Sequence, residues 1–375
     1  MAGKTQKNRQ IRTVHVAAGG GYDVLVQNGI LSDCDVHIRK ACPAAEKAAV
    51  ICDRNVLLPH AEAVCTALSD GGIDHELFVL ESGEAHKNMQ TYGQILEFLA
   101  SARLSRSDCV VALGGGVTGD MAGFAAATYL RGISYVQIPT TLLAMVDSSV
   151  GGKTAIDLNA GKNLAGAFCQ PSLVLCDPLA LRTLQDDVFR DGCAEVLKYG
   201  VLYDRAFFLK LKAMAEGRTS GQSIKQALQK EIAPVIKNCV SWKRDVVEQD
   251  EFDRGERKKL NLGHTFGHGI ERLSEYRISH GCAVAAGMAI MARAAAKKGL
   301  MPKEDAQLLE ETLESFGLPT ETDQEAAKLA EAARSDKKAQ QQTIDLIVPY
   351  GIGDCRILRT DLSELQEWIE TGLSW

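Results

Sequence analysis

The N-terminal third of the chain alternates between short apolar runs and longer segments with the spacing of an amphipathic helix. Strands that alternate with helices are typical of a mainly parallel sheet covered by helices, and this pattern limits the region to an α/β domain. The predicted strands are 13–17, 23–27, 48–52, 76–80, 109–113 and 134–138, and the predicted helices are 58–68, 88–100 and 121–130.

A glycine-rich segment, Gly114–Asp120 (GGGVTGD), lies between the strand 109–113 and the following helix. A dinucleotide pyrophosphate often binds at such a junction, because backbone N–H groups and the helix N-terminus face the phosphates. The spacing is not G-x-G-x-x-G, so on these residues alone a tight structural turn explains the segment equally well. In the loop 81–87, which follows another strand, Glu84 is suited to ribose hydroxyls and Lys87 to phosphate, although a solvated loop would also explain both.

Residues 139–166 form an unusually long stretch rich in Thr, Ser, Gly and Asn. A loop of this length within a compact domain is usually functional or disordered, and its many small and apolar residues argue against disorder. Lys153 and Lys162 supply cations that a phosphate would need, although either alone would pass for a surface lysine. We therefore expect a functional loop here.

From about residue 180 the helical spacing dominates. We expect an α-helical second domain with one late strand, and we place the domain boundary between 180 and 181. The predicted helices are 193–202, 204–216, 223–248, 258–274, 283–298, 302–316, 323–334 and 362–368, and the predicted strand is 343–348.

Two histidines, His264 and His268, lie four residues apart in a glycine-rich helical segment, and His280 follows. Residues four apart share a helix face, and two imidazoles on one face suggest a metal, most often zinc. No Glu follows His264, so the His-Glu-x-x-His protease pattern is absent. The alternative reading is that both are hydrogen-bonded histidines of the core.

Glu195 and Lys198 are three residues apart and therefore also share a helix face. An ordinary surface ion pair, which contributes little to stability, would explain this spacing.

The net charge of −6 and the pI near 5.8 give the chain no general attraction to nucleic acid or to an anionic membrane. The 11 cysteines are scattered without a C-x-x-C pair, which is typical of reduced thiols in a cytoplasmic protein. We see no secretory signal in the first residues and no apolar run long enough to span a membrane.

Taken together, these segments resemble the 3-dehydroquinate synthase family over nearly the whole chain. The matching segments are Ser82-Gly83-Glu84-x-x-Lys87, Gly114–Asp120, 139–157 (PTTLLAMVDSSVGGKTAID), Gly161-Lys162-Asn163, Ala194–Gly200, Leu260–His268, His280-Gly281 and Asp336-Lys337-Lys338. The resemblance implies a Rossmann-like NAD-binding α/β domain over 1–180 and an all-α metal-binding domain over 181–375, with the active site between them. It also implies a homodimer.

The resemblance further implies a phosphate lyase of the shikimate pathway, which leads to aromatic amino acids. Its substrate would be 3-deoxy-D-arabino-heptulosonate 7-phosphate, and its cofactors would be NAD and a zinc or cobalt ion. The implied metal ligands are Glu195, His264 and His280, so that His268 would face the substrate instead of the metal.

The same resemblance assigns the remaining site residues. Those implied around the substrate are Lys153, Asn163, Asn261, His268 and one of Lys337 and Lys338 at the phosphate, Arg131 from a second subunit, Lys198, Lys243 and Arg257 at the carboxylate and hydroxyls, and Asp147 at the hydroxyls. Those implied around NAD are Asp53, Glu84, Lys87, Gly115, Gly116, Asp120, Thr140, Thr141, Lys153, Lys162 and Thr183.

The chain departs from the family pattern at two places. Cys282 stands where the family commonly has Glu. A residue next to the metal ligands helps to orient them, so this substitution could change the orientation of the implied ligands. The residues after Lys338 lack a usual Gly, so the choice between Lys337 and Lys338 stays open. The alternatives are a sister sugar-phosphate cyclase that makes an inosose or a valiolone, a metal-dependent dehydrogenase of the glycerol dehydrogenase type, and a non-catalytic binding protein.

Overall fold

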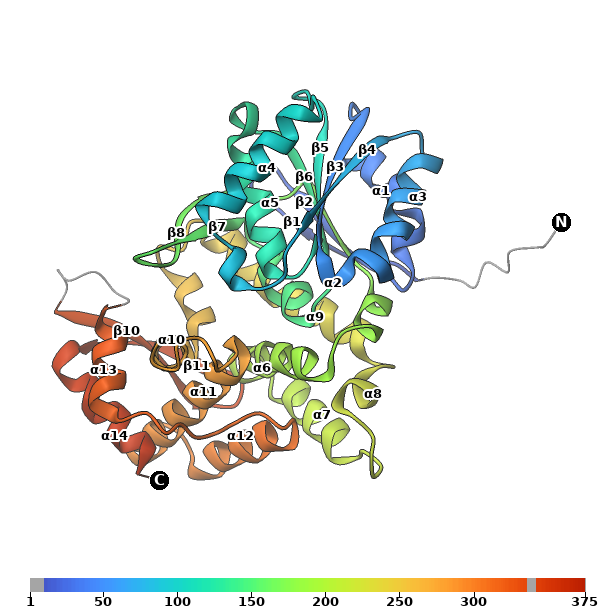
Figure 1. Cartoon of the computed structure of the whole chain (residues 1–375). Helices are drawn as coiled ribbons and strands as arrows, with labels where there is room; N and C mark the ends of the chain where they lie inside the picture. The colour runs from blue at the N-terminus through green and yellow to red at the C-terminus, as the bar shows by residue number, and fades with distance from the viewer. Residues whose placement is uncertain (1–9, 336–341, 375) are drawn as a thin grey trace. The chain divides into compact units, whose positions relative to one another are not determined.

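A computed structural model describes residues 10–335 and 342–374 of the chain, whose elements are labelled in Figure 1. The chain divides into two compact units, one within Met1–Leu184 and Ile232–Phe252 and the other within Gln185–Glu231 and Asp253–Trp375. The first segment of the first unit ends at Leu184. The chain nevertheless returns to the first unit for helix α9 (Ile232–Gln249), which the sequence analysis did not foresee.

The first unit is built on a seven-stranded sheet in the order β1-β2-β9-β6-β5-β3-β4. Every neighbouring pair is parallel except β1–β2 at one edge, as the alternating pattern predicts. The strands are β1 (Arg12–Val16), β2 (Tyr22–Val26), β3 (Lys47–Asp53), β4 (Asp74–Leu80), β5 (Cys109–Gly114), β6 (Ser134–Pro139) and β9 (Leu173–Cys176).

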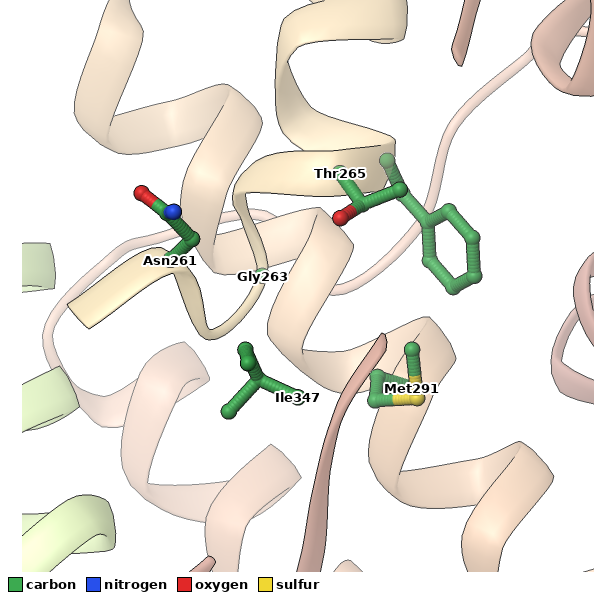
Figure 2. A pocket seen from close by; sticks show the side chains of 6 residues that line it. Asn261, Gly263, Thr265, Met291 and Ile347 are labelled. Atoms are coloured by element: carbon green, nitrogen blue, oxygen red, sulfur yellow. The ribbon is translucent and has the colours of Figure 1, made fainter. Parts of the chain in front are cut away.

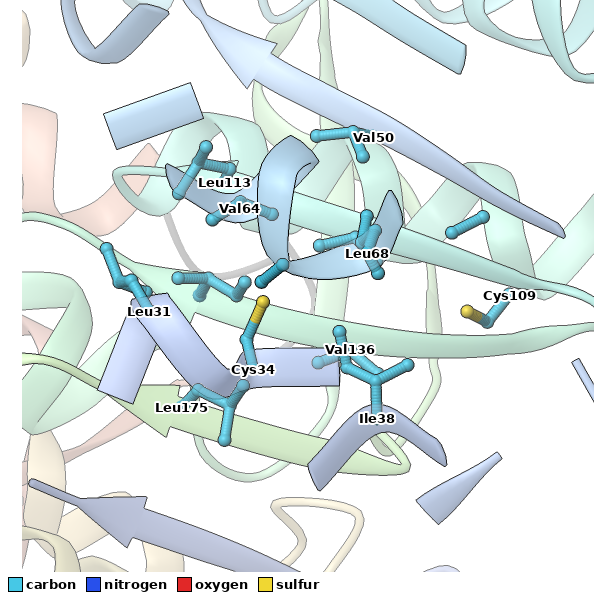
Figure 3. Packing of buried hydrophobic residues seen from close by; sticks show 14 of the residues in the cluster. Leu31, Cys34, Ile38, Val50, Val64, Leu68, Cys109, Leu113, Val136 and Leu175 are labelled. Carbon is cyan, nitrogen blue, oxygen red and sulfur yellow. The ribbon is translucent and has the colours of Figure 1, made fainter. Parts of the chain in front are cut away.

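Helices cover both faces of this sheet (Figure 1). On one face, α1 (Cys34–Ala41) and α3 (Glu62–Asp70) pack against the strands, and Figure 3 shows part of that core. On the other face lie α4 (Met89–Ser101) and α5 (Gly116–Thr128). Within β5, Val111 and Leu113 belong to the first core and Val110 and Ala112 to the second. A strand buried on both faces must be apolar throughout, which explains its unbroken hydrophobic run.

The carboxyl ends of β3 and β5 lie side by side at the point where the strand order reverses. Cys52 pairs with Leu113, so Asp53 and Gly114 leave the sheet next to each other. From β3 the chain continues to β4 on one side, and from β5 it continues to β6 on the other. Ligands of open parallel sheets bind in the crevice outside such a switch point.

Residues 139–166 do not form the single long loop that we expected. They contain a π-helical turn, Ala144–Ser148, and a hairpin of β7 (Lys153–Leu158) and β8 (Gly161–Phe168). The glycines and asparagines here have low strand propensity, which hides the hairpin in the sequence. Packing overrides this propensity, because Thr154 and Ile156 are buried.

The second unit is helical with one antiparallel hairpin, and the sequence predicted the first strand of that hairpin. Helix α11 is buried along nearly its whole length, consistent with its run of alanines and other apolar residues. The elements are α6 (Asp186–Tyr203), α7 (Arg205–Glu216), α8 (Ile224–Leu228), α10 (His264–Leu273), α11 (His280–Lys297), α12 (Lys303–Ser315), α13 (Ala326–Ser335), β10 (Thr343–Gly351), β11 (Asp354–Asp361) and α14 (Leu365–Leu373).

Two predicted helices are each divided in the structure. The segment 223–248 splits into α8 and α9, and 258–274 splits into a 3-10 turn, Glu256–Asn261, followed by α10. Gly263 separates the latter two elements with a left-handed backbone at φ 78°. Among the described residues, no helix combines the length and apolarity needed to cross a membrane.

Candidate metal centre and nucleotide site

Three helices of the second unit bring Glu195, His264 and His280 together. Oε1 of Glu195 lies 3.4 Å from Nε2 of His264 and 3.3 Å from Nε2 of His280. All three potential ligand atoms lie within 4.8 Å of one another. Oxygen and nitrogen ligands of tetrahedral zinc, each about 2.0–2.2 Å from the ion, are about 3.3–3.5 Å apart. The two carboxylate–imidazole distances are therefore those expected around a single zinc-sized ion.

Close backbone packing makes this convergence possible. A Cβ atom on Gly281, at the start of α11, would lie 1.9 Å from the carbonyl oxygen of Asp191 on α6. A Cβ atom on Gly263, just before α10, would lie 2.6 Å from the carbonyl oxygen of Val284 on α11. Since any larger residue would separate these helices, the two glycines set the spacing of the residues that carry the cluster.

Both imidazoles are oriented through their other ring nitrogen. Nδ1 of His264 lies 3.0 Å from the carbonyl oxygen of Leu262, and Nδ1 of His280 lies 3.2 Å from Oε2 of Glu271. These hydrogen bonds direct both Nε2 atoms toward Glu195, as is usual for metal-bound histidines. The sequence analysis missed Glu271, although it lies seven residues after His264 and therefore on the same helix face.

Cys282 does not disturb this orientation. Its backbone N–H donates to Oδ1 of Asp191 at 3.0 Å, which holds the start of α11 against α6. The hydrogen bonds that fix the two imidazoles come instead from Leu262 and Glu271.

The electrostatics of the cluster depend on burial and on Glu195. Burial, with help from the Lys198 ammonium, lowers the pKa of His264 to about 3. Burial also acts to lower the pKa of His280, but hydrogen bonds to Glu195 and Glu271 outweigh it and raise that pKa to about 10. The carboxylate of Glu195 forms an additional ion pair with the ammonium of Lys198, and both side chains are buried. The buried carboxylate of Glu195 thus lies next to the Lys198 ammonium and the imidazoles of His264 and His280.

His268 lies close to this cluster as well. Its ring centroid is 5.4 Å from that of His264 and 6.2 Å from that of His280. A second possible ligand set, His268 with Glu271 and His280, also has its ligand atoms within 4.8 Å of one another. The geometry alone therefore permits two ligand sets, which share His280.

The turn before α10 carries two further predicted residues. Arg257 is buried and lies in the 3-10 turn with Asn261. Figure 2 shows Asn261 and Gly263 leading into α10, with Met291 and Ile347 packed nearby. The ion pair between Lys258 and Asp345 of β10, at 2.7 Å, holds the same turn.

In the first unit, the Lys87 ammonium lies close to residues that the sequence assigned to the nucleotide and to one, Asn163, that it assigned to the substrate phosphate. Its ammonium lies 2.6 Å from Oδ2 of Asp120, 2.5 Å from Oδ1 of Asn163 and 4.0 Å from Oε1 of Glu84. Lys162 lies 3.7 Å from the same Glu84 oxygen. Burial raises the pKa of Asp120 to about 6, and the Lys87 ammonium opposes this rise.

The glycine-rich turn after β5 is suited to the close approach of a ligand. A Cβ atom on Gly115 would lie 3.1 Å from the Thr141 side chain, so the turn lies directly against the chain that leaves β6. Gly115 caps α5 without a side-chain hydrogen bond, and the buried hydroxyl of Thr140 finds no hydrogen-bond partner among the described residues. Backbone N–H groups at such a helix start bind phosphate oxygens.

Other predicted nucleotide residues lie at the same edge of the sheet. Asp53 ends β3, and its Oδ1 accepts from the Ser82 hydroxyl at 2.6 Å and from the Asn55 N–H at 2.7 Å. Thr183, which follows β9, has its hydroxyl 2.8 Å from Nε2 of His60. The carboxyl ends of the parallel strands therefore collect these residues, as the fold predicts.

The return of the chain through α9 places Lys243 in the first unit. Its ammonium lies 3.0 Å from Oδ1 of Asp147. Lys153 is exposed at the start of β7, and Arg131 is exposed with a left-handed backbone at φ 68°. Lys337 and Lys338 lie outside the described residues.

The sequence of the chain matches a known protein family. The models of the N-terminal and C-terminal parts of 3-dehydroquinate synthase match residues 77–191 and 192–339. The chain is 39% identical to a 3-dehydroquinate synthase from Clostridium acetobutylicum, over 96% of this chain and 99% of the relative. It is 43% identical to that from Pelobacter propionicus, over 92% of this chain and 94% of the relative.

Solved structures agree on the fold. A 2-epi-5-epi-valiolone synthase from Streptomyces hygroscopicus subsp. jinggangensis, with NAD+ and Zn2+ bound, superposes with a TM-score of 0.83 at 26% identity, over 94% of this chain and 97% of that chain. A probable glycerol dehydrogenase from Sinorhizobium meliloti covers 94% of this chain and 96% of its own, but at a TM-score of only 0.59 and 14% identity. It therefore shares the general fold alone.

Proposed function

The chain belongs to the 3-dehydroquinate synthase family, and on that basis we propose that it converts 3-deoxy-D-arabino-heptulosonate 7-phosphate to 3-dehydroquinate and phosphate. This is a phosphate-lyase step of the shikimate pathway, which leads to aromatic amino acids. The structural observation that carries the proposal is the convergence of Glu195, His264 and His280 at distances that suit one metal ion.

The chemistry explains why such an enzyme needs two cofactors. Eliminating phosphate requires an acidic C–H beside a carbonyl, but the substrate has an alcohol at that position. NAD, when bound, accepts a hydride from this alcohol and returns it after elimination, so that no NADH accumulates. A zinc or cobalt ion held by Glu195, His264 and His280 would have a coordination position left for substrate hydroxyls and would polarise the one that is oxidised.

The residues of the first unit hold the nucleotide in this proposal. Gly115 and Gly116, at the start of α5, offer backbone N–H groups to the pyrophosphate, and Asp53 accepts ribose hydroxyls. Lys87 fixes Asp120 by a direct contact of 2.6 Å. The remaining contacts are assigned to Glu84, Thr140, Thr141, Lys153, Lys162 and Thr183.

The substrate is doubly anionic, and the proposal assigns it local cations in an otherwise acidic protein. Lys198 and Arg257, both buried, and Lys243, held by Asp147, bind the carboxylate and hydroxyls. The phosphate is assigned to Lys153, Asn163, Asn261, His268, one of Lys337 and Lys338, and Arg131 of a second subunit.

Proton transfer and ring closure need little beyond orientation. The departing phosphate itself removes the proton that the transient ketone has made acidic. Ring opening and the intramolecular aldol closure then depend on the ends of the chain being held in place. A homodimer and a cytoplasmic location remain predictions from the sequence.

A test measures phosphate release and NADH together. Purified protein with zinc and NAD is expected to release phosphate from the heptulosonate phosphate without accumulating NADH. A sister cyclase would instead consume a heptose or glucose phosphate. A glycerol-dehydrogenase-type enzyme would accumulate NADH with simple alcohols and would release no phosphate.

A further inference from the structure

The second unit contains a cavity of about 530 Å3 that none of the assigned residues lines. Its walls come from the first turns of α6 and α11, from α10, from the turn that precedes α11, and from the segment after α12. Small-molecule sites have volumes of roughly 300–1,000 Å3, so the cavity is large enough for a ligand.

Two arginines in the cavity wall lack acidic partners. Nε of Arg190 is buried and has no hydrogen-bond partner among the residues that the structure describes. Arg277 donates its Nε to the carbonyl oxygen of Ser274 at 2.9 Å. Across residues 10–335 and 342–374, neither guanidinium forms an ion pair with a carboxylate. Because arginine stays charged at every physiological pH, an unmatched buried N–H group is unfavourable until an acceptor is bound.

Two of the three carboxylates in the wall each accept a backbone N–H, and none of the three forms an ion pair with Arg190 or Arg277 in the part of the chain that the structure describes. Oδ1 of Asp187 accepts the backbone N–H of Val188 at 2.8 Å, and Oδ1 of Asp191 accepts that of Cys282 at 3.0 Å. Glu321 is exposed and interacts electrostatically with Arg293, outside the cavity wall. Within the described residues, Nε of Arg190 is therefore the buried donor in the wall that still lacks an acceptor, while the exposed Arg277 adds a second positive charge.

Part of the remaining wall is apolar. Ile270, Ile278 and Pro319 line the cavity beside the two arginines. A guanidinium presents a planar pair of N–H groups that matches the two oxygens of a carboxylate or phosphate. We propose that this cavity binds a small organic anion, with its oxyanion group on Arg190 and Arg277 and its hydrocarbon body against the apolar wall.

Calorimetric titration of the full-length protein, loaded with zinc and saturated with NAD, tests this proposal. The probes are benzoate and phenyl phosphate, which share a ring but differ in the oxyanion and lack the hydroxyls of a sugar. We expect at least one of them to bind, and we expect Arg190→Gln and Arg277→Gln each to weaken that probe at least tenfold. The stronger probe identifies the preferred oxyanion.

Arg356→Gln is the matched control, because this arginine of the same unit pairs with Asp354 at 2.8 Å outside the cavity. It should leave probe affinity unchanged. If Arg190→Gln fails to fold, Arg277→Gln decides the matter, since Arg277 is exposed. The proposal is overturned if neither probe binds the NAD-saturated protein at millimolar concentration, or if Arg277→Gln binds the probe as tightly as the unaltered protein. Phosphate release from the sugar phosphate is a separate readout that decides only the catalytic proposal.

Discussion

Glu271 fixes the ring of His280, with 3.2 Å between its Oε2 and Nδ1, and so turns Nε2 of that histidine toward Glu195. Glu271 is buried and lies on α10, whereas His280 begins α11. A metal site in this position would therefore depend on a residue that does not itself touch the ion.

We predict that Glu271→Ala weakens zinc binding about 10- to 100-fold, because His280 loses the acceptor that fixes its orientation. Glu271→Gln should weaken it less, since the amide oxygen still accepts a hydrogen bond. Competition with a chromophoric chelator measures both affinities. Identical zinc affinity in all three proteins would show that Glu271 has no orienting role.

We predict that His268 does not bind the metal, unlike Glu195, His264 and His280. Glu195→Gln and His264→Ala are expected to lose bound zinc, because the first replaces an anionic carboxylate with a neutral amide and the second removes a proposed ligand atom. His268→Ala should retain zinc and slow turnover. Metal content of the purified proteins, determined by mass spectrometry, distinguishes the two ligand sets that the geometry permits. Zinc loss in His268→Ala with retention in Glu195→Gln would establish the other set.

Much of the first unit can be read from the sequence, because buried parallel strands are apolar throughout and helices separate them. The prediction missed β9, whose four residues are too short a run to be distinctive. It also missed α1, which is a short amphipathic segment. The hairpin β7–β8 escaped detection because its fold depends on burial of Thr154 and Ile156, which local propensity does not reveal.

The residues of the candidate site were less predictable from local patterns than the strands and helices of the first unit. Spacing alone pairs His264 with His268, and the family resemblance was needed to select Glu195 and His280 instead. The structure brings Glu195, His264 and His280 together, whereas their roles remain predictions. Glu271 could have been identified from its helical spacing to His264. Arg190 and Arg277 could not have been identified from the sequence, because their lack of acidic partners appears only once the chain is folded.

Gly281 provides a stability test of the helix packing. Gly281→Ala should lower the free energy of unfolding by about 2–4 kcal/mol and release metal, because the added Cβ would meet the Asp191 carbonyl. Thermal or urea unfolding measures the change.

Gly93→Ala is the control for this substitution. Gly93 lies within α4, and a Cβ atom there would meet nothing within 4 Å. Alanine should stabilise the helix by about 1 kcal/mol. A Gly281→Ala protein as stable as the unaltered one would contradict the proposed close approach of α6 and α11.

Asp120 gives a pH dependence of stability whose sign follows from burial. Burial raises its pKa from 3.8 to about 6. Asp120 therefore contributes fully to the free energy of unfolding below pH 4, and this contribution is lost as the pH rises through about 6. A rise of this size corresponds to about 3 kcal/mol. Relative to Asp120→Asn, the unaltered protein should therefore lose stability between pH 4 and pH 6.5. Urea unfolding at several pH values measures the difference, and a constant difference would refute the raised pKa.

The central claim is that Glu195, His264 and His280 hold the ion of a cyclase that recycles its NAD. The most direct measurement follows phosphate release and near-ultraviolet NADH absorbance in the same cuvette, with the heptulosonate phosphate as substrate. The account predicts many turnovers of phosphate per enzyme with no net NADH, and loss of this activity in Glu195→Gln. Stoichiometric accumulation of NADH, or full phosphate release by Glu195→Gln, would contradict it.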